Sequence, residues 1–330
     1  MSNFRTVVSP GSSPQKMGIS DRILTIGSCF ADAIGTRLQL NRLKVLANPF
    51  GNLYNPHSIH KAIRYALYNE LPPTHTFLDR DGICFNYDFH SEVSGVNQHN
   101  LLGKLKEITG AAHYHLAASK WIIITYGTAW VYERKETGEI VANCHKIPNN
   151  YFTKSLLTQQ EITESFGKLH NELKQFNPGI KIIVTVSPVR HIKDTLELNS
   201  VSKAVLRATC HTAAGSFGDV SYFPSYEIML DDLRDYRFYK ADMIHSSDVA
   251  EDYIWEKFGE TYFAQDVKTF LSQWKEIQQA INHRPFHPSS PAHQSFLRET
   301  LKRLESLKDT IDVEDEVALI KSQIEKIVKT

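Results

Sequence analysis

Four short apolar segments, separated by amphipathic helical stretches, limit most strongly what this chain can fold into. They are residues 23–27, 121–126, 180–186 and 220–223, and each is rich in β-branched or aromatic side chains. Apolar runs of this length are typical of strands that are buried on both faces. Because helical stretches alternate with them, the pattern predicts a parallel, doubly wound sheet in a three-layer α/β/α fold.

The chain is expected to consist of one main domain with a part on either side. Residues 1–20 are predicted to be an extended leader, and residues 21–284 the α/β domain, with an aromatic hairpin inserted at about residues 76–95. The next ten residues hold three prolines and two serines, which indicates a linker. Two amphipathic helices follow and complete a C-terminal extension over residues 285–330. They would pack on the main domain or bind a helical partner, including a second copy of the chain.

Charge and hydropathy argue against several classes of protein. Lys+Arg and Asp+Glu number 37 each, so no basic excess favours nucleic acid or a membrane surface. Hydrophobic residues make up 42% of the chain and charged residues 22%, as in ordinary globular proteins. No apolar run approaches the ~18 residues that span a bilayer. The polar first 16 residues lack the core of a signal peptide, so a cytoplasmic protein is predicted.

The cysteines do not indicate a metal site or a disulfide framework. Cys29, Cys84, Cys144 and Cys210 are far apart in the sequence, with no Cys-x-x-Cys pair. We therefore predict neither a metal ion nor another cofactor. Buried free thiols are the expected state of the last three, whereas Cys29 is distinguished by its position.

Ser28 and Cys29 are predicted to lie on a tight turn between a strand and a helix. Gly27 ends the strand over residues 23–27, and apolar side chains spaced by four follow the turn. In open α/β sheets, ligands bind at the carboxyl ends of the strands. The free N–H groups at a helix amino terminus stabilise a thiolate or an oxyanion, so we expect a lowered pKa for Cys29.

The sequence Gly-Ser-Cys-Phe-Ala over residues 27–31 resembles the name-giving motif of the GSCFA family, which belongs to the SGNH (GDSL-type) hydrolase superfamily. The resemblance covers about residues 20–265. It implies an α/β/α hydrolase or acyltransferase that acts on a small acyl ester or thioester, such as an acylated glycan. The Gly-Asp-Ser of the superfamily has its nucleophilic serine third, so Cys29 occupies the nucleophile position. Ser28 occupies the aspartate position and is the alternative nucleophile.

Two further stretches match the superfamily blocks that build an oxyanion hole. Gly51 matches the glycine whose backbone N–H binds the oxyanion, and the side chain of Asn52 would add a donor. Gly127 and Thr128 begin the block in which the superfamily has an asparagine. This chain has Ala129 at the position of that asparagine, which leaves Asn52 and also His90 as candidate replacements.

The last superfamily block supplies the base. Asp242-Met243-Ile244-His245 has the Asp-x-x-His spacing, which places a carboxylate against Nδ1 of the imidazole and leaves Nε2 to face the nucleophile. This block lies in a long predicted loop, residues 224–248. Asp194 and His191 are a rival pair at the end of another strand.

Two arginines lie in stretches that match the GSCFA family rather than the whole superfamily. Arg190 and Arg237 follow predicted strands on the side where the site is expected, and either could bind an anionic group of the substrate. Ion pairs that merely hold a loop are the alternative role for these arginines.

The serine at 28 and the alanine at 129 favour a second hypothesis for the whole chain. In this hypothesis the protein keeps the hydrolase fold and binds a ligand without catalysis.

Overall fold

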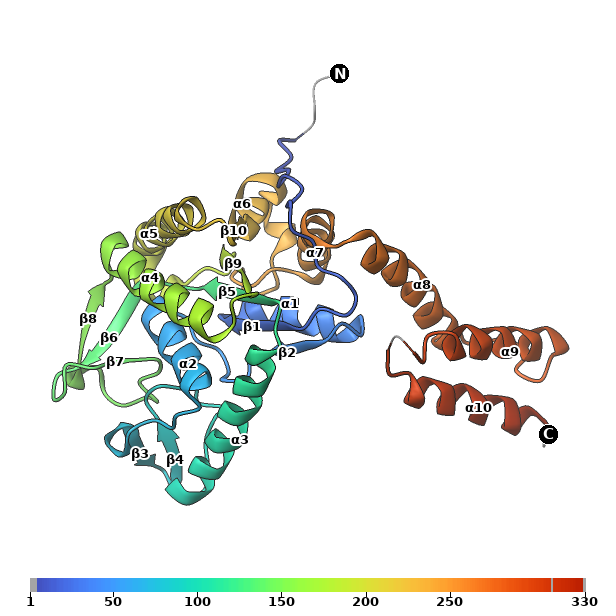
Figure 1. Ribbon diagram of the computed structural model, residues 1–330, viewed down its shortest axis with the longest axis horizontal. Coiled ribbons are helices and arrows are strands. Elements are labelled where there is room, and N and C mark those ends of the chain that lie inside the picture. The colour runs from blue at the N-terminus through green and yellow to red at the C-terminus, as the bar shows by residue number, and fades with distance from the viewer. Residues whose placement is uncertain (1–4, 310, 329–330) are drawn as a thin grey trace.

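The computed structural model describes residues 5–309 and 311–328. Its centre is a five-stranded parallel sheet with the strand order β10-β9-β5-β1-β2, shown in Figure 1. The strands are β1 (Ile23–Gly27), β2 (Val45–Ala47), β5 (Trp121–Tyr126), β9 (Lys181–Val186) and β10 (Val220–Phe223). The predicted parallel sheet is therefore confirmed. From β1 the chain adds β2 on one side and then β5, β9 and β10 on the other, so the direction of the strand order reverses between β1 and β5.

Helices cover both faces of this sheet. One face carries α2 (Pro56–Tyr68), α3 (Gln98–Ala117), α4 (Gln159–Phe176) and α5 (Thr195–Ser216). The other face carries α1 (Cys29–Leu40) and α7 (Asp248–Tyr262). Because side chains alternate along a strand, Leu24 and Ile26 pack in the first layer and Ile23 packs in the second. The three-layer α/β/α architecture is confirmed.

Local sequence signals set the starts of several helices. Thr158 and Glu161 form a complete capping box at the start of α4, with each side chain bonded to the other residue's backbone. At the start of α2, the side chain of Asn55 accepts a hydrogen bond from the N–H of Ser58, and Pro56 occupies the first turn. These signals fix the first residues of α2 and α4.

A hairpin and a small antiparallel sheet are inserted into the main domain. The hairpin of β3 (Phe77–Arg80) and β4 (Ile83–Asn86) lies inside the predicted insertion. β6 (Trp130–Arg134) pairs with β7 (Ile140–Val141). It also pairs with β8 (Phe152–Leu156), a strand that the sequence did not predict. Most of β8 is exposed and it lacks apolar alternation, so only its long-range pairing with β6 defines it.

The segment predicted as a loop over residues 224–248 is partly helical, which corrects that prediction. It begins with α6 (Ser225–Glu227), which continues into the π-helical turn η4 (Ile228–Leu233). Ile228 and Met229 of this turn are buried, and their packing stabilises a conformation that local propensity does not favour. Short 3-10 turns complete the list: η1 (Thr74–Thr76), η2 (Asn149–Tyr151), η3 (Ile192–Asp194) and η5 (Tyr236–Phe238).

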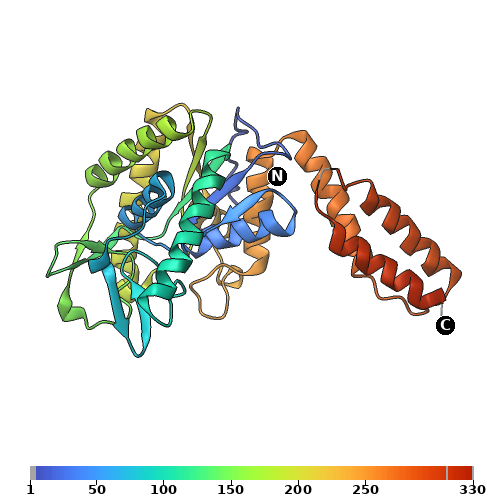
Figure 2. The ribbon, with the colours of Figure 1, turned by 60° about the horizontal axis from the view of Figure 1, so that its bottom comes forward.

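The C-terminal helices project from the main body, as Figure 2 shows. They are α8 (Gln265–Ile281), α9 (Pro291–Glu305) and α10 (Glu314–Val328). Trp274, Leu304 and Ile320 belong to a separate buried cluster that these helices share. The indole N–H of Trp274 donates to the Leu40 carbonyl at 3.0 Å and fastens the extension to the end of α1. The predicted helical extension is present, and α8 contributes to its core.

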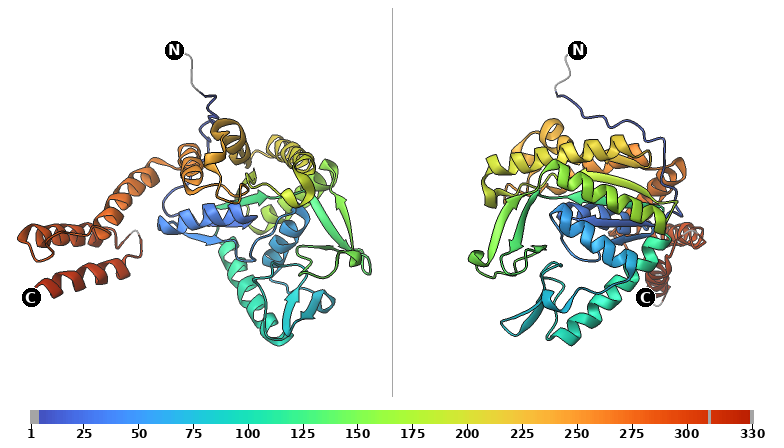
Figure 3. Two further views of the ribbon diagram at one scale, coloured as in Figure 1. Left: turned by 180° about the vertical axis from the view of Figure 1, so that it is seen from behind. Right: turned by 60° about the vertical axis from the view of Figure 1, so that its left-hand side comes forward.

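Residues 5–22, which precede β1, lie along the outside of the main domain (Figure 3). The N–H of Ser13 donates to the Thr261 carbonyl at 3.0 Å, and the N–H of Met17 donates to the Tyr262 carbonyl at 2.7 Å. Met17 is buried against the end of α7. Among the helices of the described residues, none combines the length and the apolar character needed to cross a membrane.

Gly27→Ala is expected to destabilise the fold by about 4 kcal/mol or more, because strain and a backbone clash add. Gly27 has a φ of +136°, and a Cβ there would lie 2.1 Å from the Thr125 carbonyl oxygen. The midpoint of guanidinium unfolding, followed by circular dichroism, measures the loss. Gly167→Ala on α4 is the control, since open space surrounds that position and helix propensity favours alanine. An unchanged midpoint for Gly27→Ala would contradict the turn geometry.

Candidate active site

The turn after β1 is held by two other segments. The N–H of Gly27 donates to Oδ1 of Asn48 at 3.0 Å. The N–H of Ser28 donates to the Thr125 carbonyl of β5 at 3.1 Å. Ser28 is the N-cap residue of α1, and Cys29 is the first residue of that helix. Because the strand order reverses between β1 and β5, this turn lies where open α/β sheets bind ligands.

The two candidate nucleophiles differ in exposure. Ser28 is fully buried, and its Oγ has no hydrogen-bond partner within the described part of the chain. Cys29 is partly exposed and lines a surface pocket of about 320 Å³. This geometry favours the sulfur of Cys29 over the hydroxyl of Ser28 as the atom that meets a ligand.

His245 lines the same pocket and is oriented by Asp242. Its Nδ1 lies 2.7 Å from Oδ2 of Asp242, whose Oδ1 accepts from the N–H groups of Ile244 and His245 at 2.9 and 3.0 Å. The hydrogen bond from the imidazole, followed by those from the two amides, lowers the pKa of Asp242 to about 2. The ionised carboxylate can only accept, so Nδ1 carries a proton and Nε2 is left to exchange protons.

Burial raises the pKa of the Cys29 thiol to about 11, which corrects the prediction of a lowered value. The ammonium of Lys203 lowers this pKa and the carboxyl group of Asp32 raises it. The N–H groups of Cys29 and Phe30 also lower it, as predicted for a helix terminus, but the loss of hydration outweighs them. Within the described residues, no hydrogen bond joins the sulfur to His245.

The predicted oxyanion donor Gly51 is already engaged. Its N–H donates to the Asn48 carbonyl at 2.9 Å, so this amide is not free to bind an oxyanion. Gly51 has a φ of +72°, and a Cβ added there would lie 2.9 Å from the Cβ of His90, so only glycine fits this position.

The predicted donor Asn52 is engaged with a neighbouring side chain. Its Oδ1 accepts from the side chain of Asn48 at 3.3 Å. Burial raises the pKa of Asp32, and these two asparagine side chains oppose the effect.

The amides that follow β5 are engaged as well. The N–H groups of Gly127 and Thr128 both donate to the Tyr54 carbonyl, at 2.8 and 3.0 Å. The N–H of Ala129 donates to Oγ of Ser202 at 2.7 Å. The block after β5 therefore holds the neighbouring loop and α5, and its N–H groups do not face the pocket.

Three other predicted substrate-binding residues, His90, Arg190 and Arg237, do not line the pocket at Cys29. The guanidinium of Arg190 lies 4.7 Å from the ring centroid of Tyr239, beside a separate small hollow. The side chain of Arg237 is 70% exposed. In this arrangement neither arginine is placed to bind a group on a substrate that fills the pocket.

The rival pair of His191 and Asp194 does not form. The carboxylate of Asp194 pairs with Lys154 instead. The ring of His191 packs edge-on against Tyr54 with centroids 5.4 Å apart. Its Nε2 is buried without a hydrogen-bond partner among the residues described, 3.2 Å from a Cβ added to Gly127. Burial lowers the pKa of His191 to about 3, so the ring is neutral.

The comparison with family models agrees with the motif. The model of the GSCFA family matches residues 22–258, which is more than half of the chain. The chain belongs to the GSCFA family. A second model, described as the C-terminal domain of GSCFA domain proteins, matches residues 274–326. That range runs from the later part of α8 into α10.

The other comparisons add little about this GSCFA-family chain. A search of curated proteins finds no match. Among solved structures, a Streptococcus pneumonia protein described as a proposed platelet activating factor matches with a TM-score of 0.39 and 11% identity. The match covers 73% of this chain and 84% of that protein. A likeness this distant carries no argument about function.

Lys203 of this GSCFA-family chain is not among the predicted site residues, but its charge acts on Cys29. It is 1% exposed, and its Nζ donates to the carbonyls of Gly127 and Ser187 at 2.7 Å each. Leu206 and Cys210 are buried three and seven residues further along α5. This helical spacing is the signal that could have placed the lysine on the inner face.

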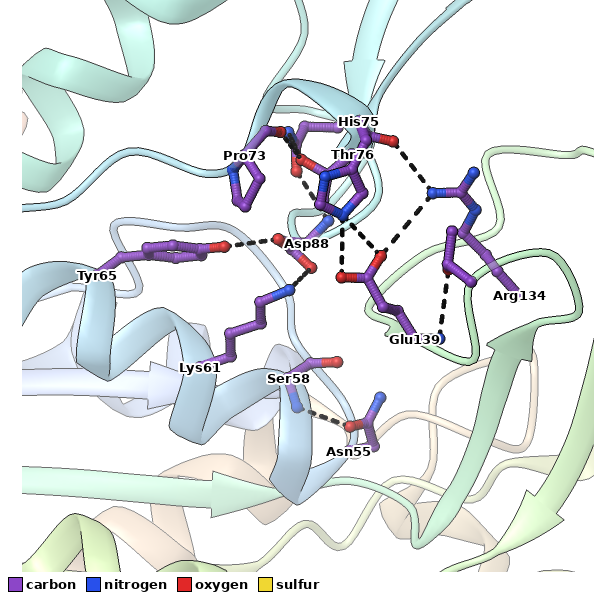
Figure 4. A network of polar contacts seen from close by, with 12 residues as sticks. Asn55, Ser58, Lys61, Tyr65, Pro73, His75, Thr76, Asp88, Arg134 and Glu139 are labelled. Atoms are coloured by element: carbon purple, nitrogen blue, oxygen red, sulfur yellow. Dashed lines mark hydrogen bonds and ion pairs between the residues drawn. The ribbon is translucent and has the colours of Figure 1, made fainter.

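A polar network joins the inserted hairpin to α2 (Figure 4). The carboxylate of Asp88 accepts from Nζ of Lys61 and from the hydroxyl of Tyr65, each at 2.7 Å. Nε2 of His75 lies 3.0 Å from the Glu139 carboxylate, which belongs to the loop before β7. Since Asp88 is nearly buried, these bonds fix the loop that places His90 against Gly51.

Two histidines on α2 have a spacing that is also found in metal sites. The ring nitrogens of His60 lie 2.8 Å from Oγ of Ser165 and 2.7 Å from the hydroxyl of Tyr126. His60 is fully buried and both of its ring nitrogens are engaged, so it belongs to the packing of α2. Over residues 5–309 and 311–328, no three His, Cys, Asp or Glu side chains gather into a group that could hold a metal ion.

Proposed function

We propose that this GSCFA-family protein is an SGNH-like hydrolase or acyltransferase that acts on a small acyl ester or thioester through Cys29. One observation carries the proposal. Cys29, at the amino terminus of α1, and His245, oriented by Asp242, line a single pocket at the carboxyl edge of the sheet. A nucleophile, a base and a group that orients the base are the parts that acyl transfer needs.

The proposed reaction begins when Nε2 of His245 accepts the thiol proton of Cys29 and the sulfur attacks the carbonyl carbon. The bond to the leaving oxygen or sulfur breaks, and His245 returns the proton to that leaving group. The acyl group remains on Cys29 as a thioester. Water or a sugar hydroxyl then attacks it, and His245 passes the proton to the departing sulfur. Hydrogen bonds of this kind often form only in the complex with substrate.

The amides of Cys29 and Phe30 are the best candidates for binding the oxyanion. Both lie close enough to the sulfur to lower the pKa of the thiol. They open α1, where helix N–H groups lack intrahelical acceptors. This arrangement replaces the superfamily asparagine, for which Ala129 offers no donor, and the amide of Gly51, which is engaged elsewhere.

The pocket lining supports a polar substrate. Asp32, Arg37, Lys240 and Glu251 contribute to the wall beside Cys29. Arg37 pairs with Glu251 at 2.7 Å. Charged side chains around a pocket of about 320 Å³ suit a small acyl group on a polyhydroxylated acceptor better than a long acyl chain. This favours the acylated glycan among the substrate classes.

A binding protein without catalytic activity is the second candidate. The raised pKa of the Cys29 thiol and the alanine at 129 favour it, because a neutral thiol is a weak nucleophile and an oxyanion donor is missing. It would use the same pocket to hold an acylated ligand.

Intact-mass spectrometry of the wild-type protein separates the two candidates. The protein is incubated with a panel of p-nitrophenyl esters and acyl thioesters, and peptides are then mapped. The proposal predicts a mass increase equal to one acyl group, located on the peptide that contains Cys29. Unmodified protein with every donor, together with a thermal shift on adding acylated sugars, would favour the binding protein.

A further inference from the structure

Asp32 lies one helical turn beyond Cys29, in the wall of the same pocket. Side chains three residues apart on a helix have Cβ atoms about 5–6 Å apart, so the carboxyl group of Asp32 lies close to the thiol. The face of α1 that forms this wall repeats at spacings of three and four residues. Its members are Cys29, Asp32, Ala33, Thr36 and Arg37.

The lysine and the arginine of this pocket already have acidic partners. Nη1 of Arg37 lies 2.7 Å from Oε2 of Glu251, and its Nη2 lies 2.9 Å from Oδ1 of Asp252. Nζ of Lys240 lies 3.6 Å from Oδ1 of Asp248. Each of the two cations is therefore matched by at least one carboxylate, and neither is committed to Asp32.

Asp32 has no such partner in the described part of the chain. Over those residues, no Lys, Arg or His nitrogen lies within 4.0 Å of its carboxylate, and no donor forms a hydrogen bond with either oxygen. Burial raises the pKa of Asp32, and the side-chain amides of Asn48 and Asn52 approach closely enough to oppose this effect. Asp32 is partly exposed, and neither oxygen is among the buried atoms that lack a partner. The carboxylate is therefore accessible and able to accept hydrogen bonds from a ligand.

We propose that Asp32 is a specificity-determining residue that accepts a hydrogen bond from an amine or hydroxyl group of the substrate and disfavours substrates with a negative charge beside the reacting carbonyl. The inference rests on the proposed role of Cys29 as nucleophile and narrows the substrate class. An ionised carboxylate can only accept hydrogen bonds, so it matches an ammonium or a sugar hydroxyl. A carboxylate or phosphate on the substrate would meet a like charge, and this repulsion rejects it.

Charged thiol reagents test the field at Cys29 without any substrate. Aminoethyl, hydroxyethyl and sulfonatoethyl methanethiosulfonates are similar in size and carry a positive charge, no charge and a negative charge. Their rates with the Cys29 peptide are measured at one slightly alkaline pH for the wild type and Asp32→Asn. Each rate is divided by the rate of the same reagent with free cysteine.

The ratio of the aminoethyl rate to the sulfonatoethyl rate is expected to fall about tenfold in Asp32→Asn. A unit charge about 6 Å away changes each rate by about threefold in water, and the two reagents change in opposite directions. Asp32 also raises the pKa of the thiol, but a change in that pKa affects all three reagents alike and cancels in the ratio.

The same labelled samples contain an internal control. Cys144 is also partly exposed and lies outside the pocket, so its ratio should not change. Glu299→Gln, at an exposed position on α9, is the matched variant and should leave the ratio at Cys29 unchanged. Asp32→Glu keeps the charge and should keep most of the preference. Asp32→Ser removes the same charge and serves if Asp32→Asn does not fold.

The outcomes decide both the role of Asp32 and the group that it binds. An unchanged ratio in folded Asp32→Asn, or an equal fall in Asp32→Glu, overturns the inference. An aminoethyl rate above the hydroxyethyl rate, with the difference lost in Asp32→Asn, supports it and identifies an amine. Equal rates for these two reagents that fall together in Asp32→Asn support it and identify a hydroxyl.

This inference and the proposed function fail in different ways. If the ratio does not change while acyl donors still label Cys29, the role of Asp32 is wrong and the proposed function stands. If the ratio falls as expected and no donor labels Cys29, the acyl-transfer proposal is the part that fails, and Asp32 selects the ligand of a binding protein.

Discussion

Cys29→Ala is expected to abolish acyl-enzyme formation with every donor that labels the wild type. The sulfur is the atom to which the acyl group would be bound, and the neighbouring Ser28 hydroxyl is buried away from the pocket. Ser28→Ala should therefore keep the adduct. Cys144→Ala is a matched control, since its thiol is also partly exposed and does not line this pocket. Intact mass after a fixed incubation measures the fraction labelled.

The outcomes identify the nucleophile directly. An adduct that is lost in Ser28→Ala and kept in Cys29→Ala would move the nucleophile by one residue and contradict the assignment. It would also require the turn after β1 to rearrange, because Ser28 is fully buried in the structure. Loss in Cys144→Ala alone would mean that the donors react with an ordinary thiol elsewhere.

His245→Asn is expected to slow acylation by about a thousandfold. General base catalysis by a positioned side chain contributes between a hundredfold and ten-thousandfold to the rate. The amide side chain of asparagine is not a base near neutral pH, so it cannot accept the thiol proton. The release of p-nitrophenolate in a single turnover measures the rate for whichever ester labels Cys29. A folded His245→Asn that reacts as fast as the wild type would show that another group removes the proton.

Two comparisons sharpen this prediction. His99→Asn, at an exposed position on α3, is expected to leave the rate unchanged. Asp242→Asn should slow acylation by about a hundredfold, because the imidazole loses the acceptor that fixes its tautomer. Since the pKa of Asp242 is lowered to about 2, its carboxylate is ionised at higher pH. Any fall in rate between pH 8 and 5 must therefore come from another group.

The elements of the sheet could be read from the sequence because their signals are local. The apolar runs at residues 23–27, 121–126 and 220–223 form strands with these same bounds. The capping box at Thr158 and Glu161 forms as expected. Strand alternation and helix caps depend on neighbours a few residues away, so they survive whatever the rest of the chain does. For the same reason the Gly-Ser-Cys turn could be placed at the edge of the sheet.

The chemical state of the candidate site depends on contacts that local sequence does not encode. The N–H groups of Gly51, Gly127 and Thr128 match a motif, but their acceptors are the carbonyls of Asn48 and Tyr54. Which acceptor an amide meets is set by how loops close against one another.

The pKa values of buried groups also depend on contacts between distant parts of the chain. A helix terminus predicts a lowered pKa for Cys29, and that contribution is present, but the burial of the sulfur outweighs it. Lys203 lies 174 positions further along the chain, and the packing of α5 brings its ammonium within electrostatic reach of the sulfur. The sequence by itself determined four strands of the central sheet, the helix starts and the strand-to-helix turn. The tertiary structure alone decided which groups lose their water and which charges they meet, because desolvation and Coulomb energies depend on distance in space.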